Sequence, residues 1–307
     1  MNTFDTMHNS QYIVRLSGGL GNQMFQYAAA RALSLRHSAS LAADLTWFSQ
    51  QFDVQTTPRE YALPAFRLNL PEADKRIVAT FRLNPTELRI VSFLRHRICF
   101  PSRFLPRHIT ELSFDYWDGF RDILPPAYLD GYWQSERYFS DYPDIIRADF
   151  SMLSISEQAA WMSAKIASVQ DSISLHIRRG DYVNSLATRK AHGIDTERYY
   201  AKALEWIADR IGAATIFAFS DDPRWVRANF DFGKHKGIVV DGSWTAHEDM
   251  HLMSLCSHHI IANSSFSWWG AWLSTSQGIT IAPKSWFSNP HIWTPDVCPA
   301  TWERIPC

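Results

Sequence analysis

The sequence of 307 residues is about twice the length of one typical domain, so it predicts two domains of similar size. Hydrophobic residues make up 46% of the chain and charged residues 20%, which excludes an intrinsically disordered protein. Basic residues number 30 and acidic residues 31, and the resulting net charge of -1 excludes a general attraction to nucleic acid.

The first elements form a strand, a glycine turn, a helix and a second strand. Residues 12–17 (YIVRLS) have the composition of a short strand, residues 24–36 are Ala-rich and helical, and residues 40–45 return to a strand pattern. The segment GGLGNQ at 18–23 connects the first strand to the helix. This βαβ order is typical of a parallel sheet.

The glycine segment at 18–23 resembles half of a dinucleotide fingerprint. Gly19 and Gly21 have the required spacing, but Met24 stands where the third glycine belongs, and no GK[ST] follows to make a P-loop. Glycines allow a backbone to approach a ligand closely, and Asn22 and Gln23 carry amide donors at a helix start. We therefore expect Gly19, Gly21, Asn22 and Gln23 to contact a ligand.

Residues 53–130 are less regular and rich in proline. One helix stands out, because Asn84, Pro85 and Glu87 form a capping signature at its start, and it extends to about residue 99. Eight basic residues and one acid lie between Lys75 and Arg107. A solvated helix face explains such a segment. The alternative is peripheral contact through residues 75–107 with an anionic membrane or a lipid-linked substrate.

The second half alternates strands and helices. Strands are predicted at 172–177, 215–220, 236–240, 259–263 and 278–282, with helices at 196–210, 223–230, 246–257 and 264–275. This order predicts a doubly wound parallel sheet. We place the domain boundary near residue 150, with an N-terminal, acceptor-side domain at 1–150 and a C-terminal, nucleotide-sugar-binding domain at 151–307.

Polar residues follow each strand of the second half. In an open parallel sheet, ligands bind outside the carboxyl ends of the strands, so these residues are expected at one edge. Arginine forks such as those of Arg178 and Arg179 can bind phosphate oxygens in a bidentate manner, which suits a diphosphate. The residues at this edge are Arg178, Arg179, Gly180, Asp181, Asp221, Asp222, Asp241, Gly242, Ser264, Ser265, Lys284 and Ser285.

Two of these positions have alternative explanations. Ser264 and Ser265 begin a helix, so they either cap it or offer its N-terminus to a phosphate. Asp222 precedes a proline and can cap the next helix, while a carboxylate of the pair Asp221 and Asp222 can instead accept N–H bonds from a guanine edge. A divalent metal bridged by the pair is disfavoured, because the arginines already supply the countercharge.

Two further motifs suggest other functions. Residues 247–251 read HEDMH, a literal HExxH zinc motif, but Ser254 and Ser257 replace the later glycine and histidine of the extended motif. A zinc metallopeptidase is therefore only a distant alternative. Trp268 and Trp272 could stack on a sugar, although their helical spacing favours packing in the core.

The compartment is expected to be the cytoplasm. The N-terminal segment MNTFDTMHNSQ lacks the apolar run of a secretory signal, and the four cysteines form no CxxC pair. No stretch approaches the roughly 18 apolar residues of a membrane span. Association with the inner face of the cytoplasmic membrane would then be peripheral.

Five segments together resemble the bacterial α-1,2-fucosyltransferases of glycosyltransferase family 11. They occur in the family's order from the first strand almost to the end of the chain, and HIRRGDY, with His176, Arg178, Arg179 and Asp181, is the most specific box. The segments are IVRLSGGLGNQMFQYAAARAL (13–33), GYWQSERYF (131–139), LHIRRGDYV (175–183), FAFSDDPRWV (217–226) and LMSLCSHHIIANSSFSWWGAWLS (252–274).

The resemblance implies a GT-B-like α/β fold of two Rossmann-like domains with a cleft between them. It implies inverting, metal-independent transfer of L-fucose from GDP-fucose to the 2-hydroxyl of a β-galactoside. We expect this transfer to serve surface polysaccharide or O-antigen synthesis, with a lipid-linked acceptor as one alternative. Arg178 would hold the β-phosphate, with His176 and Asp181 as further catalytic candidates. By the same resemblance, His176, Asp222, Ser264 and Ser265 would line the nucleotide site. We add Arg179, Asp221, Asn263, Gly19, Gly21, Asn22 and Gln23 as expected donor contacts, and Trp133 and Gln134 as expected acceptor-side residues.

Rival functions differ in their ligands. Another GDP-deoxysugar could replace GDP-fucose in the same fold, a zinc peptidase would need a stoichiometric metal, and a carbohydrate-binding module would bind sugar without GDP. The paired arginines argue against the last. The sequence thus predicts an enzyme that needs no cofactor and no metal, and has no nucleic-acid partner.

Overall fold

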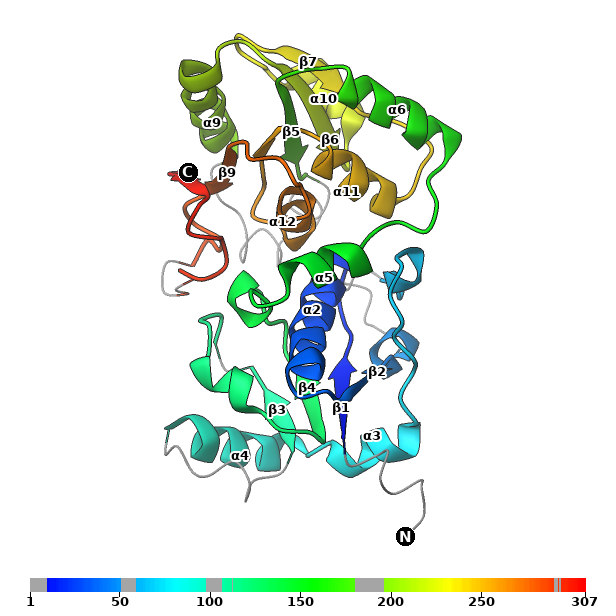
Figure 1. Ribbon diagram of the computed structural model, residues 1–307. Helices are drawn as coiled ribbons and strands as arrows, with labels where there is room; N and C mark the ends of the chain where they lie inside the picture. The colour runs from blue at the N-terminus through cyan, green and yellow to red at the C-terminus, as the bar shows by residue number, and fades with distance from the viewer. Residues whose placement is uncertain are drawn as a thin grey trace. The chain divides into compact units, whose positions relative to one another are not determined.

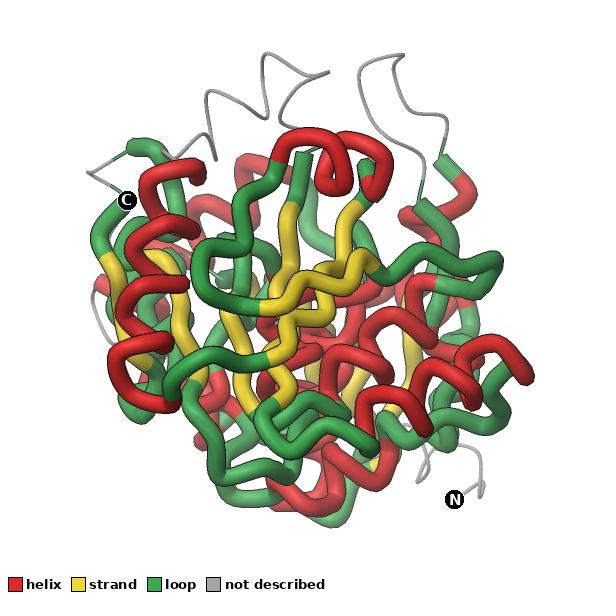
Figure 2. Tube along the Cα trace, turned by 90° about the horizontal axis from the view of Figure 1, so that it is seen from above, coloured by secondary structure: helices red, strands yellow, loops and turns green. Residues whose placement is uncertain are grey.

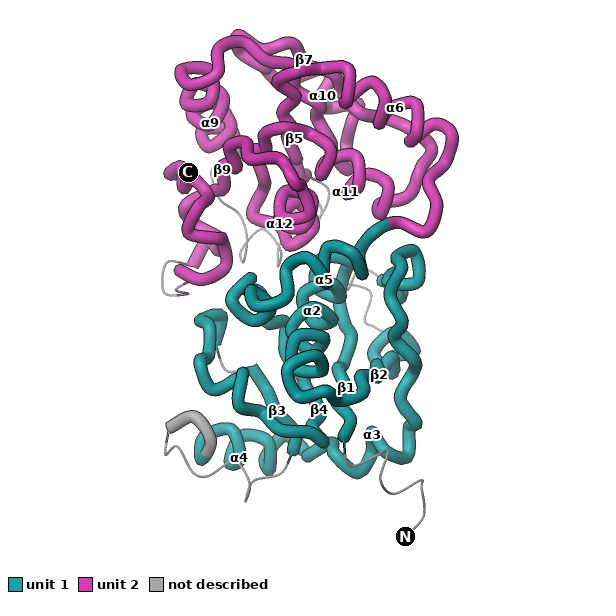
Figure 3. Tube along the Cα trace, in the orientation of Figure 1, with its two compact units in different colours: residues 1–151 teal, residues 152–307 magenta. Residues whose placement is uncertain are grey.

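The chain divides into two compact units, residues 1–151 and 152–307 (Figure 3). The computed structural model describes residues 10–50, 59–97, 107–111, 113–179, 196–289, 292 and 294–307. Each unit contains a parallel sheet with helices on its faces (Figure 1). The acceptor-side and donor-side roles given to the two halves stay predictions.

Unit 1 is built on a four-stranded parallel sheet with strand order β2-β1-β4-β3. Its strands are β1 (Gln11–Arg15), β2 (Ser40–Asp44), β3 (His108–Thr110) and β4 (Ala127–Asp130). Its helices are α2 (Leu20–Arg36), α3 (Lys75–Phe81), α4 (Pro85–Arg97) and α5 (Pro143–Asp149), with 3-10 turns at Thr46–Ser49, Leu63–Ala65, Asp118–Asp122 and Glu136–Tyr138.

Both faces of this sheet are covered, as the alternation of side chains along a strand requires. Ile13 of β1 and Tyr128 of β4 pack against Val78 of α3. The neighbouring residues of β1, Tyr12 and Val14, are fully buried as well, on the face that α2 covers. The apolar pattern of β1 is therefore continuous rather than alternating, as expected for a buried parallel strand.

Unit 2 is built on a six-stranded parallel sheet with strand order β10-β9-β8-β5-β6-β7. The strands are β5 (Ser172–Ile177), β6 (Thr215–Ser220), β7 (Lys236–Val239), β8 (His258–Ile260), β9 (Thr280–Pro283) and β10 (Glu303–Ile305). The helices are α6 (Glu157–Ala167), α9 (Thr196–Ile211), α10 (Pro223–Asn229), α11 (Ala246–Ser254) and α12 (Ser265–Trp272), and they alternate with the strands along the chain (Figure 2).

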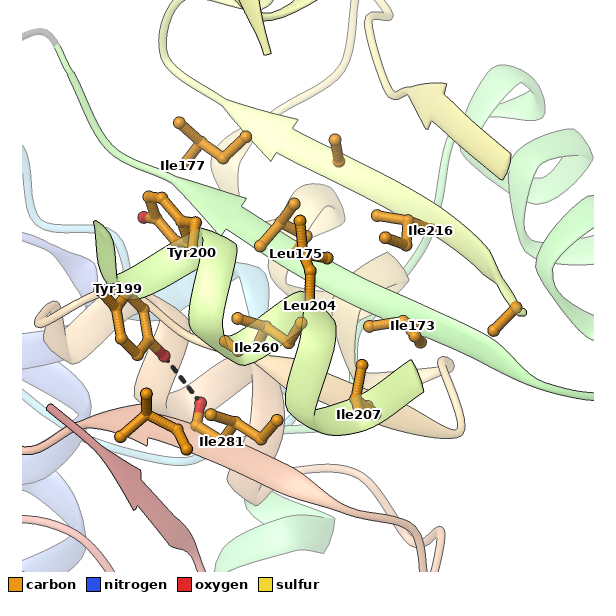
Figure 4. Close-up of a cluster of buried hydrophobic side chains, with 14 of the residues drawn as sticks. Ile173, Leu175, Ile177, Tyr199, Tyr200, Leu204, Ile207, Ile216, Ile260 and Ile281 are labelled. Atoms are coloured by element: carbon orange, nitrogen blue, oxygen red, sulfur yellow. Dashed lines mark hydrogen bonds between the residues drawn. The ribbon is translucent and has the colours of Figure 1, made fainter. Parts of the chain in front are cut away.

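Successive residues of β6 show how this sheet is buried on two sides. Ile216 packs with Leu204 of α9 in one apolar cluster, whose side chains line the strands and the helix in Figure 4. Phe217 packs with Met162 of α6 and Leu252 of α11 in a second cluster. Layers on both faces make the unit doubly wound, as the alternation of strands and helices predicted.

The elements differ from the sequence prediction mainly at their boundaries. Helix α2 begins at Leu20, so most of the predicted glycine turn is the first turn of the helix, and Gly19 is its N-cap. The Asn84 side chain accepts hydrogen bonds from the N–H groups of Thr86 and Glu87, while Glu87 accepts one from the Asn84 N–H, which confirms the predicted capping box. Strands β3, β4 and β10 were not predicted.

Candidate functional site

The order of the strands in unit 2 predicts where a ligand binds. From β5 the chain moves to β6 and β7 on one side, then crosses to β8, β9 and β10 on the other. The crevice outside the carboxyl ends of β5 and β8 is therefore the topological switch point of the sheet, the usual ligand site in this architecture. We call the residues that follow these strands and β6 the rim of unit 2.

Arg178 and Ser264 meet at this switch point. Arg178 follows β5 and Ser264 follows β8, and Nη1 of Arg178 donates to Oγ of Ser264 at 3.0 Å. The Ser264 hydroxyl also accepts from the N–H of Phe266 and thereby caps α12. A permanently charged guanidinium thus lies beside the N-terminus of a helix, and both features favour a bound anion.

Arg179 has a different environment from its neighbour. Its guanidinium carbon lies 3.7 Å from the ring centre of Trp225, and its Nε is 3.6 Å from Oδ2 of Asp222. Its backbone N–H donates to Oδ1 of Asp221 at 2.8 Å. The sequence predicted two arginines gripping a diphosphate together. The structure stacks Arg179 on Trp225, while Arg178 reaches Ser264 at the switch point; contact of either guanidinium with a diphosphate stays a prediction.

The two aspartates after β6 have structural partners. Asp222 caps α10 by accepting the N–H of Trp225 at 3.0 Å, so the capping alternative is confirmed for this residue. Asp221 holds the backbone of Arg179. Because the Asp222 side chain is still 43% exposed, its second oxygen can also meet a ligand at the rim. Contact between either aspartate and a guanine stays a prediction.

His176 is buried at the end of β5, with 8% of its surface exposed. Burial, aided by the charge of Arg178, lowers the pKa of the imidazole to about 3, so the ring is neutral at neutral pH. Its Nδ1 has no hydrogen-bond partner among the described residues, and its ring centre lies 5.5 Å from that of Phe266. A base of such low pKa takes up a proton poorly near pH 7, which disfavours His176 as general base.

The other predicted donor residues of unit 2 have mixed outcomes. Nδ2 of Asn263 donates to the carbonyl of Trp286 at 3.0 Å, so this buried amide shapes the loop after β8. Ser265 is the first residue of α12, directly after the cap. Asp181 lies outside the described residues.

The glycine segment of unit 1 is held together internally. Gly18 has a φ of 74°, a left-handed conformation that glycine adopts without strain. The Gln23 side chain is fully buried, and its Nε2 donates to the carbonyls of Gly18 and Glu60. Its Oε1 accepts the N–H of Ala62 at 2.9 Å. Gln23 therefore fastens two loops, and its amide is not the free donor that the sequence predicted.

The GYWQ segment lies beside the glycine segment within unit 1. Nε2 of Gln134 donates to Oδ1 of Asn22 at 3.0 Å, which joins an acceptor-side candidate to a donor-side candidate. Trp133 is only 1% exposed and packs against Phe120 and Tyr138. Its ring belongs to the core of unit 1, and contact between Trp133 and an acceptor stays a prediction.

A comparison with known sequences decides the family. Residues 107–305, more than half of the chain, match the profile of Glycosyl transferase family 11. The chain belongs to this family.

Two of the relatives are bacterial glycosyltransferases. This family 11 enzyme is 36% identical over 306 residues to the alpha-1,2-colitosyltransferase of Escherichia coli. The match covers 95% of this chain and 98% of the relative. It is 33% identical over 289 residues to the O-antigen biosynthesis glycosyltransferase WbnK of Escherichia coli, with coverage of 89% and 94%.

Among solved structures, a mutant of Arabidopsis thaliana FUT1 in complex with GDP superposes with a TM-score of 0.52. The match covers 96% of this chain and 76% of that chain at 11% identity, which shows a shared fold. The family 11 enzyme is thus GT-B-like, as predicted. No helix in the described part of the chain has the length and hydropathy to cross a bilayer.

The zinc motif of the family 11 enzyme serves to cap a helix. The carboxylate of Glu248 accepts the N–H of Thr245 in a capping box and the N–H of Ser156 at 2.6 Å. Although burial opposes the shift, these hydrogen bonds lower the pKa of Glu248 to about 2. The described residues contain no group of three His, Cys, Asp or Glu side chains able to hold a metal. The metallopeptidase alternative is not supported.

Several residues that shape the site had no clear signal in the sequence. Trp225 supports Arg179, and Tyr200 fixes the end of β5 by donating its hydroxyl to the carbonyl of His176 at 2.8 Å. Glu111 of unit 1 accepts the N–H groups of Tyr132 and Trp133 at 2.8 and 2.9 Å. A lone acid after a three-residue strand carries no recognisable pattern, so such contacts emerge only from the fold.

The Glu111 carboxyl predicts a pH dependence for unit 1. Burial raises its pKa from the ordinary 4.5 to about 7, although the N–H bonds from Tyr132 and Trp133 oppose the change. A raised pKa means that its contribution is complete below about pH 4.5 and is lost as the pH rises through about 7. Between about pH 5 and pH 8, wild type should lose about 2–3 kcal/mol of unfolding free energy relative to Glu111→Gln.

Urea unfolding of both proteins at the two pH values measures this difference. The Glu87→Gln variant is the matched control, because it makes the same substitution at an exposed helix start. Equal pH dependence in wild type and Glu111→Gln would show that Glu111 titrates as an exposed glutamate does.

Proposed function

We propose that this family 11 enzyme transfers L-fucose from GDP-fucose to the 2-hydroxyl of a β-galactoside. The transfer inverts the anomeric carbon, needs no metal, and serves the synthesis of a surface polysaccharide such as O-antigen. The observation that carries the proposal is the Arg178 guanidinium, bonded to Ser264 at the switch point of unit 2. The relation to an α-1,2-transferase and to an O-antigen transferase supports the linkage and the pathway class.

The proposed chemistry follows from where charge develops. The acceptor oxygen attacks the anomeric carbon, the bond to the β-phosphate breaks, and GDP leaves with additional negative charge. A preorganised guanidinium at the β-phosphate stabilises this charge more in the transition state than in the ground state. We assign this role to Arg178, which hydrogen-bonds Ser264, and we assign the start of α12 to the same diphosphate.

The acceptor proton needs a different route from His176. A neutral imidazole with a pKa of about 3 neither repels Arg178 nor accepts protons at neutral pH, so we assign it to lining the donor site. Asp181 is our candidate for the base, with transfer to water as the other route.

A second donor deserves equal testing, because the 36% identical relative is named for colitose. Colitose is fucose without its 3-hydroxyl, so the two GDP sugars differ by one polar group. A site that hydrogen-bonds this hydroxyl would reject the analogue lacking it by about 10⁴-fold or more, whereas an apolar pocket discriminates by only about 10²-fold. The ratio of kcat/KM for the two donors therefore reveals which sugar the site is built for.

We expect transfer to proceed at full rate in excess EDTA, because Arg178 supplies the countercharge that a metal would otherwise provide. The assay combines GDP-fucose or GDP-colitose with lactose, and NMR of the product identifies the linkage and the anomer. Activity that disappears in EDTA and returns with Mg²⁺ or Mn²⁺ would overturn the metal-independent mechanism. Transfer of colitose alone would replace fucose as the donor and leave the mechanism in place.

A further inference from the structure

Helix α4 of unit 1 has two apolar faces, and only one of them is covered. Val91 and Ser92 are buried, and the Ser92 hydroxyl lies 2.7 Å from that of Thr110 in β3. Ile90 and Phe93 are each 56% exposed. Since residues three apart on a helix are neighbours, these two side chains form one exposed apolar patch.

Basic residues flank this patch in the sequence. Arg82 and Arg89 are exposed beside it in the chain, and Lys75 and Arg76 are exposed at the start of α3. The one acid between residues 75 and 107, Glu87, hydrogen-bonds the backbone at the start of α4. With a net charge of -1 for the whole protein, this positive region is a local feature.

Isolated exposed apolar residues are common and need no explanation, but here a pair of them lies in a segment, residues 75–107, with eight basic residues and one acid. A phenylalanine and an isoleucine beside arginines suit the boundary of a bilayer, where the apolar side chains enter the headgroup region and the guanidinium groups meet anionic lipid. A second copy of this chain is a poorer occupant, since pairing through this face would bring like charges together.

We propose that the exposed face of α4, formed by Arg89, Ile90 and Phe93 with Arg82 adjoining it, docks on an anionic lipid bilayer. Both α3 and α4 lie toward the end of unit 1 at which β1 begins (Figure 1). The glycine segment and the GYWQ segment follow the opposite, carboxyl ends of β1 and β4. Docking through α4 therefore leaves that edge of unit 1 open to an acceptor. The inference does not depend on which sugar is transferred.

Flotation of the full-length protein with vesicles tests the proposal in the absence of any sugar. We expect binding to phosphatidylcholine vesicles that contain phosphatidylglycerol, little binding to phosphatidylcholine alone, and weaker binding as salt screens the charges. Arg89→Glu changes the net charge by two units. At about fivefold in affinity for each unit of charge, it should lower the affinity for the vesicles about 25-fold. The Ile90→Ser, Phe93→Ser double variant should lower it about fivefold to tenfold.

Matched controls come from unit 2. Trp161→Ser removes an aromatic side chain that is 64% exposed, and Lys234→Glu reverses an exposed charge; both should bind vesicles as wild type does. Thermal unfolding of each variant confirms its fold without reference to activity.

Three results would each overturn the proposal: no binding to the anionic vesicles, equal binding by wild type and the α4 variants, or equal losses in the unit 2 controls. Analytical ultracentrifugation tests for a dimer. If the protein dimerises and the Ile90→Ser, Phe93→Ser variant does not, the face belongs to a second copy instead. Failure of sugar transfer in the same preparation would count against the proposed function and not against docking.

Discussion

Replacing Arg178 with alanine should lower kcat by a factor of about 100 to 1,000 while leaving unit 2 folded. The guanidinium is the group placed at the switch point of the sheet, and the charge of the departing GDP develops on its phosphate. An interaction that strengthens in the transition state affects turnover more than substrate binding. Initial rates with GDP-fucose and lactose measure the loss.

Two further variants separate charge from geometry. Arg178→Lys keeps the positive charge but loses the planar fork, so it should recover only part of the rate. Arg227→Ala is the matched control, because Arg227 pairs with Asp241 at 2.8 Å near the carboxyl end of β7 and is given no part in the transfer. A wild-type rate for Arg178→Ala would refute the assignment. Equal losses in the Arg178 and Arg227 variants would point to a general effect of positive charge in unit 2.

Replacing Trp268 with alanine should lower the free energy of unfolding by about 3–5 kcal/mol. Trp268 is fully buried, its indole N–H donates to the carbonyl of Val297 at 2.7 Å, and its ring packs with Trp269 and Trp272. The alanine leaves a cavity and an unpaired carbonyl, and both are costly in a close-packed interior. Urea unfolding measures the change.

Controls distinguish packing from sugar binding by Trp268. Trp268→Phe keeps most of the apolar surface and loses the hydrogen bond, so it should cost about 1–2 kcal/mol. Trp161→Ala removes an exposed tryptophan and should change stability by less than about 0.5 kcal/mol. Wild-type stability of Trp268→Ala combined with lost transfer would instead assign the ring to a ligand.

The sequence predicted five of the six strands of unit 2 and the place of its rim, because buried parallel strands and the residues after them leave a strong pattern. It also predicted the capping box of α4, a local signal that depends on residues 84–87 alone. The sequence predicted a loop for the first residues of α2, because glycine and asparagine have low helix propensity. Burial against the sheet overrides that preference.

What the sequence could not supply were partners distant in the chain. Arg178 and Arg179 are chemically identical in the sequence, yet one meets Ser264 and the other stacks on Trp225. The strands β3, β4 and β10 contain three or four residues each, too few for a periodic pattern. The sequence likewise does not show that the Trp133 ring packs against Phe120 and Tyr138.

Helix α12 places a restriction on any attempt to redesign the donor range of this enzyme. Ser264 sits at its start, and one turn later Trp268 anchors the same helix in the tryptophan cluster. The packing of Trp268 in the interior thus fixes the position of the Ser264 hydroxyl. The hydroxyl cannot move unless these large aromatic rings repack. New sugar selectivity should therefore be sought in side chains that face the sugar, and the residues proposed to bind the diphosphate, Arg178 and Ser264, should be kept.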